Sequence, residues 1–346
     1  MNRIFSINSH LIDYQNSCID CKITYNPLNL PDNTIRVKFS AGYTPTMGDT
    51  QTLVDPINNV WDIYKESNNW GSWPPMFNGA SKLLEVLGAN TTNVTYLGSL
   101  FNACYNLSSV ALFDTHNVTN MAGTFQGCRS LTSVPPFDTS NVSSMKGMFN
   151  ECSSINTVPL LDTHNVTDMT WLFEDCTSLT SVPLLDTSNV TDMDLMFYGC
   201  GNLTSVPLFD TTNVTDMNGM FNSCSSLTSI PLFDTSNVSA MNMMLYRCYS
   251  LSSVPLLNTS NVTNMTYMLQ SCSSLTSIPL FDTTKVTKMG YMCYDCINVE
   301  NGALALYQQA STQSTPPSSH YAAFGNCGIN TVNGAVELAQ IPSNWK

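Results

Sequence analysis

Apolar residues recur along most of the chain with a fixed period of 24 residues. In the unit that begins at Cys176, the other apolar positions are Leu179, Val182, Leu185, Val190, Met193 and Phe197. The residues between them are mainly Thr, Ser, Asp and Asn. A fixed period of this length predicts stacked coils, each resting on its neighbours, instead of a globular domain folded on itself.

The spacing within one unit predicts a short strand, a turn and a short helix. The run from Leu179 to Pro183 suits a very short extended segment, and Asp186 suits an Asx-type turn. The stripe that starts at Val190 has helical spacing, and Asn189 before it predicts a helix cap. Stacked strands would form a narrow parallel sheet with neighbouring coils about 4.7–4.9 Å apart.

Cysteine occupies one position of every unit. The column consists of Cys104, Cys128, Cys152, Cys176, Cys200, Cys224, Cys248, Cys272 and Cys296. Buried, unpaired cysteine behaves as a small apolar residue. Identical side chains in stacked coils point the same way, which disfavours the torsion that a disulfide needs. We therefore expect reduced, structural cysteines.

The repeated unit CxxLTSVPLFDTSNVTDMxxMF resembles the BspA-like leucine-rich repeats of bacterial surface proteins and of gut-phage virion proteins. The resemblance covers residues 93–298. It implies an α/β leucine-rich-repeat solenoid that works by binding, and it supplies no catalytic residues. The stretch IRVKFSAGYTPTMGD resembles a segment that often precedes such repeats.

The ends of the chain differ from the repeats. We expect an anchoring segment over residues 1–20, a β-rich cap over 21–90, the solenoid over 91–298 and a C-terminal cap over 299–346. The pattern predicts a helix over Glu300–Ala310 and a loop over Ser311–Ser319. The C-terminal cap draws its apolar side chains from Phe324, Cys327, Val336, Leu338, Ile341 and Trp345.

The charge of the chain excludes some classes of partner. A net charge of −13 with only 11% charged residues argues against nucleic acid and against anionic membrane surfaces. No stretch approaches 18 apolar residues, so we expect no membrane insertion. The N-terminus lacks the apolar run of a signal peptide.

Aspartate forms a second column: Asp114, Asp138, Asp162, Asp186, Asp210, Asp234 and Asp282. Carboxylates stacked in this way could bind Ca²⁺. They could instead accept hydrogen bonds from the backbone of their own turns. We favour the turn, because Asn258 stands in the same column and keeps that bond without the charge.

No other motif indicates catalysis, a metal or a cofactor. Cys18-x-x-Cys21 and Cys293-x-x-Cys296 have the spacing of zinc or redox sites, but each stands alone in the sequence. His116 and His164 replace Ser in the turn. We interpret the Asn-Val-Thr motifs as caps and not glycosylation sites, and we expect no enzyme.

Variation between coils predicts the binding surface. It concentrates on the outer helix face and the corner after it, at Trp171, Leu195, Tyr198, Met243, Tyr246, Arg247, Tyr249, Tyr267, Tyr291 and Tyr294. These residue types are enriched at interfaces. Alternatively, these long side chains only cover the edges of the coils and bind no partner. A second candidate is the Pro-Leu strip through Pro207-Leu208, where Leu208 or Phe209 must be partly exposed.

These features lead to one functional hypothesis with two alternatives. We expect a phage virion protein, outside the cell once displayed, whose solenoid attaches to a host or surface protein or glycan. Residues 1–20 and the N-terminal cap would bind virion structural proteins. The alternatives are a bacterial surface or secreted adhesin, and a cement or decoration protein that contacts only virion neighbours.

Overall fold

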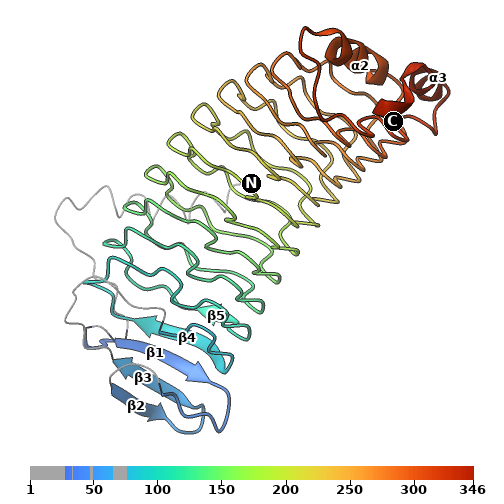
Figure 1. Cartoon of the computed structure of the whole chain (residues 1–346). Helices are drawn as coiled ribbons and strands as arrows, with labels where there is room; N and C mark the ends of the chain where they lie inside the picture. The colour runs from blue at the N-terminus through green and yellow to red at the C-terminus, as the bar shows by residue number, and fades with distance from the viewer. Residues whose placement is uncertain (1–27, 33, 47–49, 65–75) are drawn as a thin grey trace, which may run out of the picture.

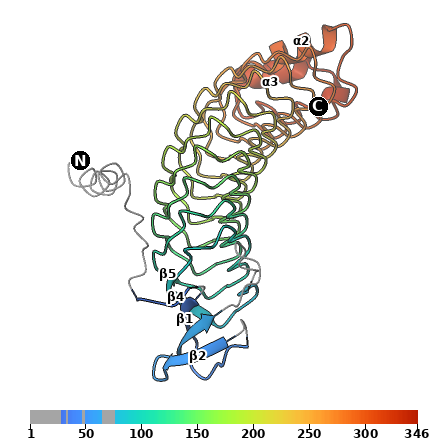
Figure 2. The same cartoon turned by 90° about the vertical axis from the view of Figure 1, so that its left-hand side faces the viewer.

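The chain forms a curved stack of coils with a sheet at its N-terminal end and short helices at its C-terminal end (Figure 1, Figure 2). This computed structural model describes residues 28–32, 34–46, 50–64 and 76–346. The predicted anchor over residues 1–20 and the pair Cys18 and Cys21 lie outside the described residues. Over the described coils, the repeated units stack into the predicted solenoid (Figure 1).

A five-stranded sheet covers the first coil. Its strands are β1 (Thr34–Phe39), β2 (Thr50–Asp55), β3 (Val60–Tyr64), β4 (Leu83–Ala89) and β5 (Ser109–Val110), in the order β2-β3-β1-β4-β5. The first three pairings are antiparallel, and β4 pairs with β5 in parallel. Because β5 belongs to the first coils, the sheet continues into the solenoid and closes its end.

The predicted helix of each coil is wrong. Residues 93–298, all of which the structure describes, contain no helix. Backbone N–H groups instead alternate between two acceptors. Met196 donates to the carbonyl of Met193 at 3.2 Å, closing a tight turn, whereas Phe197 donates to Met220 of the next coil at 2.9 Å. The next coil thus supplies the acceptors that a helix would find within itself.

The predicted strand is also mostly absent. Only β5 forms at that position in the described coils, and the other parallel pairings are single bridges such as Asp168↔Asp192 and Asp192↔Asp216. Proline explains the gap, since Pro183 and its equivalents cannot donate to a ladder. Backbone hydrogen bonds therefore join neighbouring coils mainly at their turns, as between Phe197 and Met220.

Apolar ladders fill the interior. Phe173, Phe197 and Phe221 stack with ring centroids 5.5 and 5.6 Å apart. Each of the nine repeat cysteines is buried and free, and its thiol donates to a carbonyl of the preceding coil, as Cys200 does to Phe173 at 3.0 Å. Burial raises the pKa of the Cys152 thiol to about 12. The cysteine therefore lies in the core as a packed, protonated group.

The C-terminal cap consists of α2 (Ala303–Thr312), α3 (Val332–Gln340) and the 3₁₀ turn η1 (Ser343–Trp345). Helix α2 runs slightly past the predicted loop boundary at Ser311. Phe324, Cys327, Ile341 and Trp345 are buried as expected, but Val336 is 58% exposed, so its assignment to the core is wrong. No helix among the described residues is long and apolar enough to cross a membrane.

Candidate binding faces

The aspartate column forms turns. Asp210 accepts from the backbone N–H of Thr212 at 3.0 Å and from its hydroxyl at 2.7 Å. Asn258 accepts the same pair of bonds from Ser260. The hydrogen bond from the Ser188 hydroxyl lowers the pKa of Asp186. Among the described residues there is no group of three potential metal ligands. This geometry agrees with the turn role and gives calcium no support.

The asparagines do not cap helices. The Asn189 side chain donates to the His164 carbonyl of the preceding coil at 2.7 Å, and Asn213 donates to Ser188 at 2.7 Å. In the last position of this column, the Lys285 ammonium donates to the Asn261 amide oxygen at 2.6 Å. The predicted cap is therefore corrected to a tie between coils, and it still occupies the amide that a glycan would need.

Six leucines form an exposed ridge on the Pro-Leu strip, which we call the leucine ridge. They are Leu160, Leu184, Leu208, Leu232, Leu256 and Leu280, with exposed fractions from 53% to 62%. Phe209 is only 2% exposed, so Leu208 is the outward residue of that pair. The ridge is uniform, because every one of these six coils presents the same side chain.

A column of left-handed residues marks a second part of each coil. It consists of Ser99, Gly123, Gly147, Trp171, Leu195, Gly219, Met243, Tyr267 and Tyr291, all with φ between 54° and 61°. Glycine adopts this conformation freely, whereas other residues lose roughly 1–2 kcal/mol there. We call the surface around this column the outer face. Five residues of the predicted binding set therefore hold bulky side chains where three equivalent coils use glycine.

The rest of the predicted set gathers close to this column. Tyr198, Tyr246 and Tyr294 each follow a column residue by three positions, and Arg247 occupies a second left-handed position with a φ of 59°. Tyr249 is 45% exposed at the corner beyond. The structure thus brings the set onto one side of the solenoid, with Tyr249 at its margin.

Tyrosine rings pack against one another at the C-terminal end of the outer face. The Tyr267 and Tyr291 rings are stacked, with centroids 5.2 Å apart and an angle of 15° between their planes. Tyr294 and Tyr321 each meet Tyr291 edge-on, with ring centroids 5.5 Å apart. Sequence reasoning missed Tyr321, because α2 and its loop interrupt the 24-residue register before it. Its only signal was an isolated aromatic residue after a polar loop.

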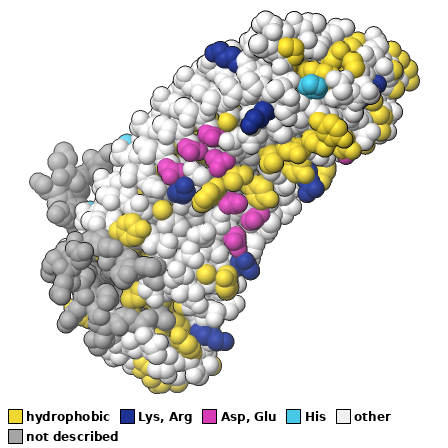
Figure 3. Space-filling view, viewed as in Figure 1, with side chains coloured by type: hydrophobic (Ala, Val, Ile, Leu, Met, Phe, Trp, Pro, Cys, Tyr) yellow, Lys and Arg dark blue, Asp and Glu magenta, His cyan; other side chains and the backbone are white. Residues whose placement is uncertain are grey.

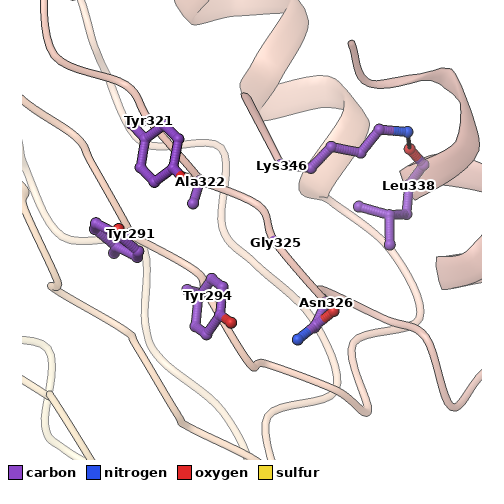
Figure 4. Close-up of a pocket in the computed structure, with 8 residues that line it drawn as sticks. All are labelled: Tyr291, Tyr294, Tyr321, Ala322, Gly325, Asn326, Leu338 and Lys346. Atoms are coloured by element: carbon purple, nitrogen blue, oxygen red, sulfur yellow. Dashed lines mark hydrogen bonds between the residues drawn. The ribbon is translucent and has the colours of Figure 1, made fainter. Parts of the chain in front are cut away.

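A cleft opens beside these rings (Figure 4). Its volume is about 450 Å³, and Tyr291, Tyr294, Tyr321 and Asn326 line it together with the Lys346 side chain. The Lys346 ammonium donates to the Leu338 carbonyl at 2.8 Å. The cleft therefore combines aromatic edges with a few polar groups.

Acidic side chains accompany the aromatic residues in the middle coils. Figure 3 shows Asp and Glu on both sides of the hydrophobic band that crosses this face. Burial raises the pKa of Glu174, Asp175 and Asp216. Burial, and then the charges of Asp216 and Asp192, raise the pKa of Asp194 to about 6, and Trp171 and Lys146 oppose that shift. The outer face thus holds carboxylates in surroundings that disfavour their charge.

A family model described as "Mycoplasma protein of unknown function, DUF285" matches four overlapping stretches, residues 72–183, 95–206, 167–274 and 202–306. Together these stretches cover more than half of the chain. No curated protein matches the chain.

Several solved structures are similar to the chain. A leucine-rich-repeat protein of T. pallidum is 18% identical with a TM-score of 0.33, over 55% of this chain and 77% of its own. One from Eubacterium ventriosum is 17% identical with a TM-score of 0.34, over 73% and 87%. An internalin from Listeria monocytogenes is 13% identical with a TM-score of 0.30, over 65% and 66%.

Proposed function

We propose that this chain, which belongs to the family described as Mycoplasma protein of unknown function, DUF285, is a non-enzymatic binding protein. Its solenoid presents the outer face to a macromolecular partner. The N-terminal sheet and the C-terminal helices close the two ends of the stack. In this proposal the coils serve as a scaffold, and the side chains that differ between coils make the contact.

The left-handed column carries this proposal. Trp171, with a φ of 60°, and Met243, with a φ of 58°, are both 37% exposed. Gly123 and Gly147 show that the same backbone path forms without a side chain. Strained residues persist where function requires them. Bulky apolar side chains that cost stability and remain exposed are therefore best explained by contact with a partner.

The leucine ridge is the competing surface. Its exposed leucines are apolar enough to form a contact, but they repeat without change from Leu160 to Leu280. A side chain that every coil shares gives a partner no way to recognise one part of the solenoid. We therefore assign recognition to the outer face.

The setting in which the chain displays this face has three candidates. We propose display on a phage virion, with residues 1–20 and the N-terminal cap bound to virion structural proteins. The genus in the family description favours the alternative, a bacterial surface or secreted adhesin. In the third setting, a virion cement protein, neighbouring virion proteins would cover the outer face.

Antibodies against the outer face distinguish these settings. Labelling of purified virions supports display. Labelling of intact bacterial cells free of phage supports the adhesin. Virions that contain the chain but bind antibody only after they are disrupted support the cement role.

Ligand selection with the full chain tests the binding face itself. The immobilised protein selects from a library of random short peptides and from a glycan array. We expect the selected ligands to lose binding to the variant Trp171→Gly/Tyr267→Gly/Tyr291→Gly. The matched variant Leu184→Ser/Leu208→Ser/Leu232→Ser, which changes the same number of residues on the ridge, should keep binding. Ligands that the glycine variant retains and the ridge variant loses would overturn the proposal.

A further inference from the structure

We infer that the partner of the outer face is a protein segment that carries both cationic and apolar side chains, and not a glycan. This inference rests on the proposed function and adds the chemistry of the partner. Three features of the face lead to it: the orientation of the aromatic rings, the unpaired carboxylates and their placement along the solenoid.

The aromatic rings have few free faces. Tyr267 and Tyr291 cover one another, and the edges of Tyr294 and Tyr321 meet Tyr291. A sugar stacks on an open ring face, so a ladder with one stacked pair and edge-on neighbours leaves it few such faces. The same ladder presents ring edges and hydroxyl groups, which suit the mixed apolar and polar contacts of a protein interface.

The cations of the outer face also lie against rings. The Lys146 ammonium is 4.6 Å from the Trp171 ring centroid, and the Arg247 guanidinium is 4.9 Å from that of Tyr246. These contacts occupy ring faces that a sugar would need. They also place both positive charges over aromatic rings, although the Lys146 charge still offsets part of the rise in the pKa of Asp194.

The carboxylates of the outer face lie beyond ion-pair distance of the described cations. Glu174, Asp175, Asp194 and Asp216 form no ion pair within 4.0 Å with any residue that the structure describes. Their partial burial disfavours the charged form, as their raised pKa values indicate. An incoming Arg or Lys would restore the lost stabilisation. The net charge of −13 would also speed the approach of a cationic partner.

The placement of these groups gives the partner a direction. Glu174 and Asp175 belong to the coil of Trp171, Asp194 to the coil of Leu195, and Asp216 to the coil after that. The tyrosine ladder and the cleft lie further toward the C-terminal cap. Figure 3 shows the hydrophobic band continuing from the acidic region toward that end. A partner segment that runs along the solenoid would therefore place its cations over the middle coils and its apolar residues over the tyrosines.

The peptides selected by the full chain test this inference. We expect them to carry net positive charge together with aromatic or aliphatic residues, and their affinity to fall as salt concentration rises. The variant Glu174→Gln/Asp194→Asn should weaken binding about fivefold, since each partly exposed ion pair contributes modestly. The control Asp210→Asn removes the same type of charge from the aspartate column and should change affinity less than about twofold.

The outcomes separate the inference from the proposed function. Selected ligands that are glycans, or peptides without net positive charge, would overturn the inference if Trp171→Gly still weakens them. Affinity that the double variant leaves unchanged would also overturn it. Ligands that are insensitive to Trp171→Gly, Tyr267→Gly and Tyr291→Gly together would instead overturn the proposed function. Unfolding temperatures of the Gln and Asn variants that equal or exceed the wild-type value would exclude misfolding as the cause.

Discussion

The leucine ridge and the outer face belong to the same coils, yet they use sequence in opposite ways. Along the ridge, Leu184, Leu208 and Leu232 repeat one side chain at 60% to 62% exposure. Along the outer face, the left-handed column changes from Gly147 to Trp171 within a single step of the stack. Uniform exposed positions give a partner no means of distinguishing one coil from another. Varied positions that oppose backbone preference indicate what a partner needs.

The acidic residues of the aspartate column and those of the outer face differ in a similar way. On the aspartate column, hydrogen bonds from the following Ser or Thr lower the pKa of Asp186, Asp234 and Asp282. On the outer face, burial raises the pKa of Asp194 and its neighbours. The first group contributes stability through its charge. The second group keeps its charge against the preference of its surroundings, which is common at functional sites.

The largest expected effect comes from the framework beneath both faces. Cys200→Ala should lower the free energy of unfolding by roughly 1–2 kcal/mol, because it truncates a fully buried side chain. The measurement is denaturant unfolding of both proteins, with and without reductant. Reductant should leave the wild type unchanged, since its described cysteines are free. A large loss of wild-type stability in reductant would mean that disulfides hold the coils.

Matched aspartate substitutions sharpen the contrast between the two acidic groups. Asp210→Ala should cost about 1 kcal/mol through its lost turn bonds, and Asp210→Asn should be nearly neutral because the amide oxygen still accepts them. Asp194→Asn should instead raise stability, since it removes a disfavoured charge. Denaturant unfolding measures all three variants. Calorimetric Ca²⁺ binding, or unfolding by a chelator, would contradict the turn role of Asp210.

Acidification should stabilise the chain before it destabilises it. The folded-state pKa of Asp194 is about 6, above its ordinary value of 3.8, so the folded chain binds more protons between these values. Stability should therefore rise as pH falls from 7 through 6, and the raised pKa of His164 acts in the same direction. Below pH 3.8 the lowered pKa values of Asp186, Asp234 and Asp282 reverse the trend.

Thermal unfolding across this pH range measures the effect, with Asp194→Asn as the control. That variant should show a smaller rise between pH 7 and pH 5. Affinity for a cationic peptide should fall over the same interval, because Asp194 loses its charge. Stability that decreases steadily from pH 7 to pH 5 would contradict this assignment of the outer-face carboxylates.

The smallest expected effect is on the ridge. Leu208→Ser should change the free energy of unfolding by no more than about 0.5 kcal/mol, since this side chain is 60% exposed. Binding of the selected ligands should not change. A loss of binding here with full stability would move recognition from the outer face to the leucine ridge.

Much of the architecture could be predicted from one unit of sequence. The period predicted the stack, and Asn258 among the aspartates predicted turns that the structure shows. The helix could not be excluded, because positions three and four apart also suit consecutive tight turns. A helix and a row of turns differ in the acceptor of each backbone N–H group. Phe197 donates to the Met220 carbonyl of the next coil, and the sequence of a single unit does not reveal that acceptor.

The site was predicted in part. Variation between coils located Trp171, Tyr267 and the rest on one side, although on turns and not on a helix. Their left-handed conformation was missed, but glycine at Gly123 and Gly147 in the same column was the available signal. Glycine that recurs at one position of a repeat indicates a backbone conformation that other residues resist. Applied to this column, that rule would have predicted the strain at Trp171.

Comparing glycine and alanine in the left-handed column tests the central claim most directly. The claim is that Trp171 and Met243 are held at positive φ for contact and not for packing. Trp171→Gly and Met243→Gly should each be more stable than the corresponding alanine variant by about 1 kcal/mol, because glycine alone relieves the backbone. The glycine variants should also unfold within about 1 kcal/mol of the wild type. Glycine variants that lose more than about 2 kcal/mol would show that these side chains pack the coils, contradicting the account.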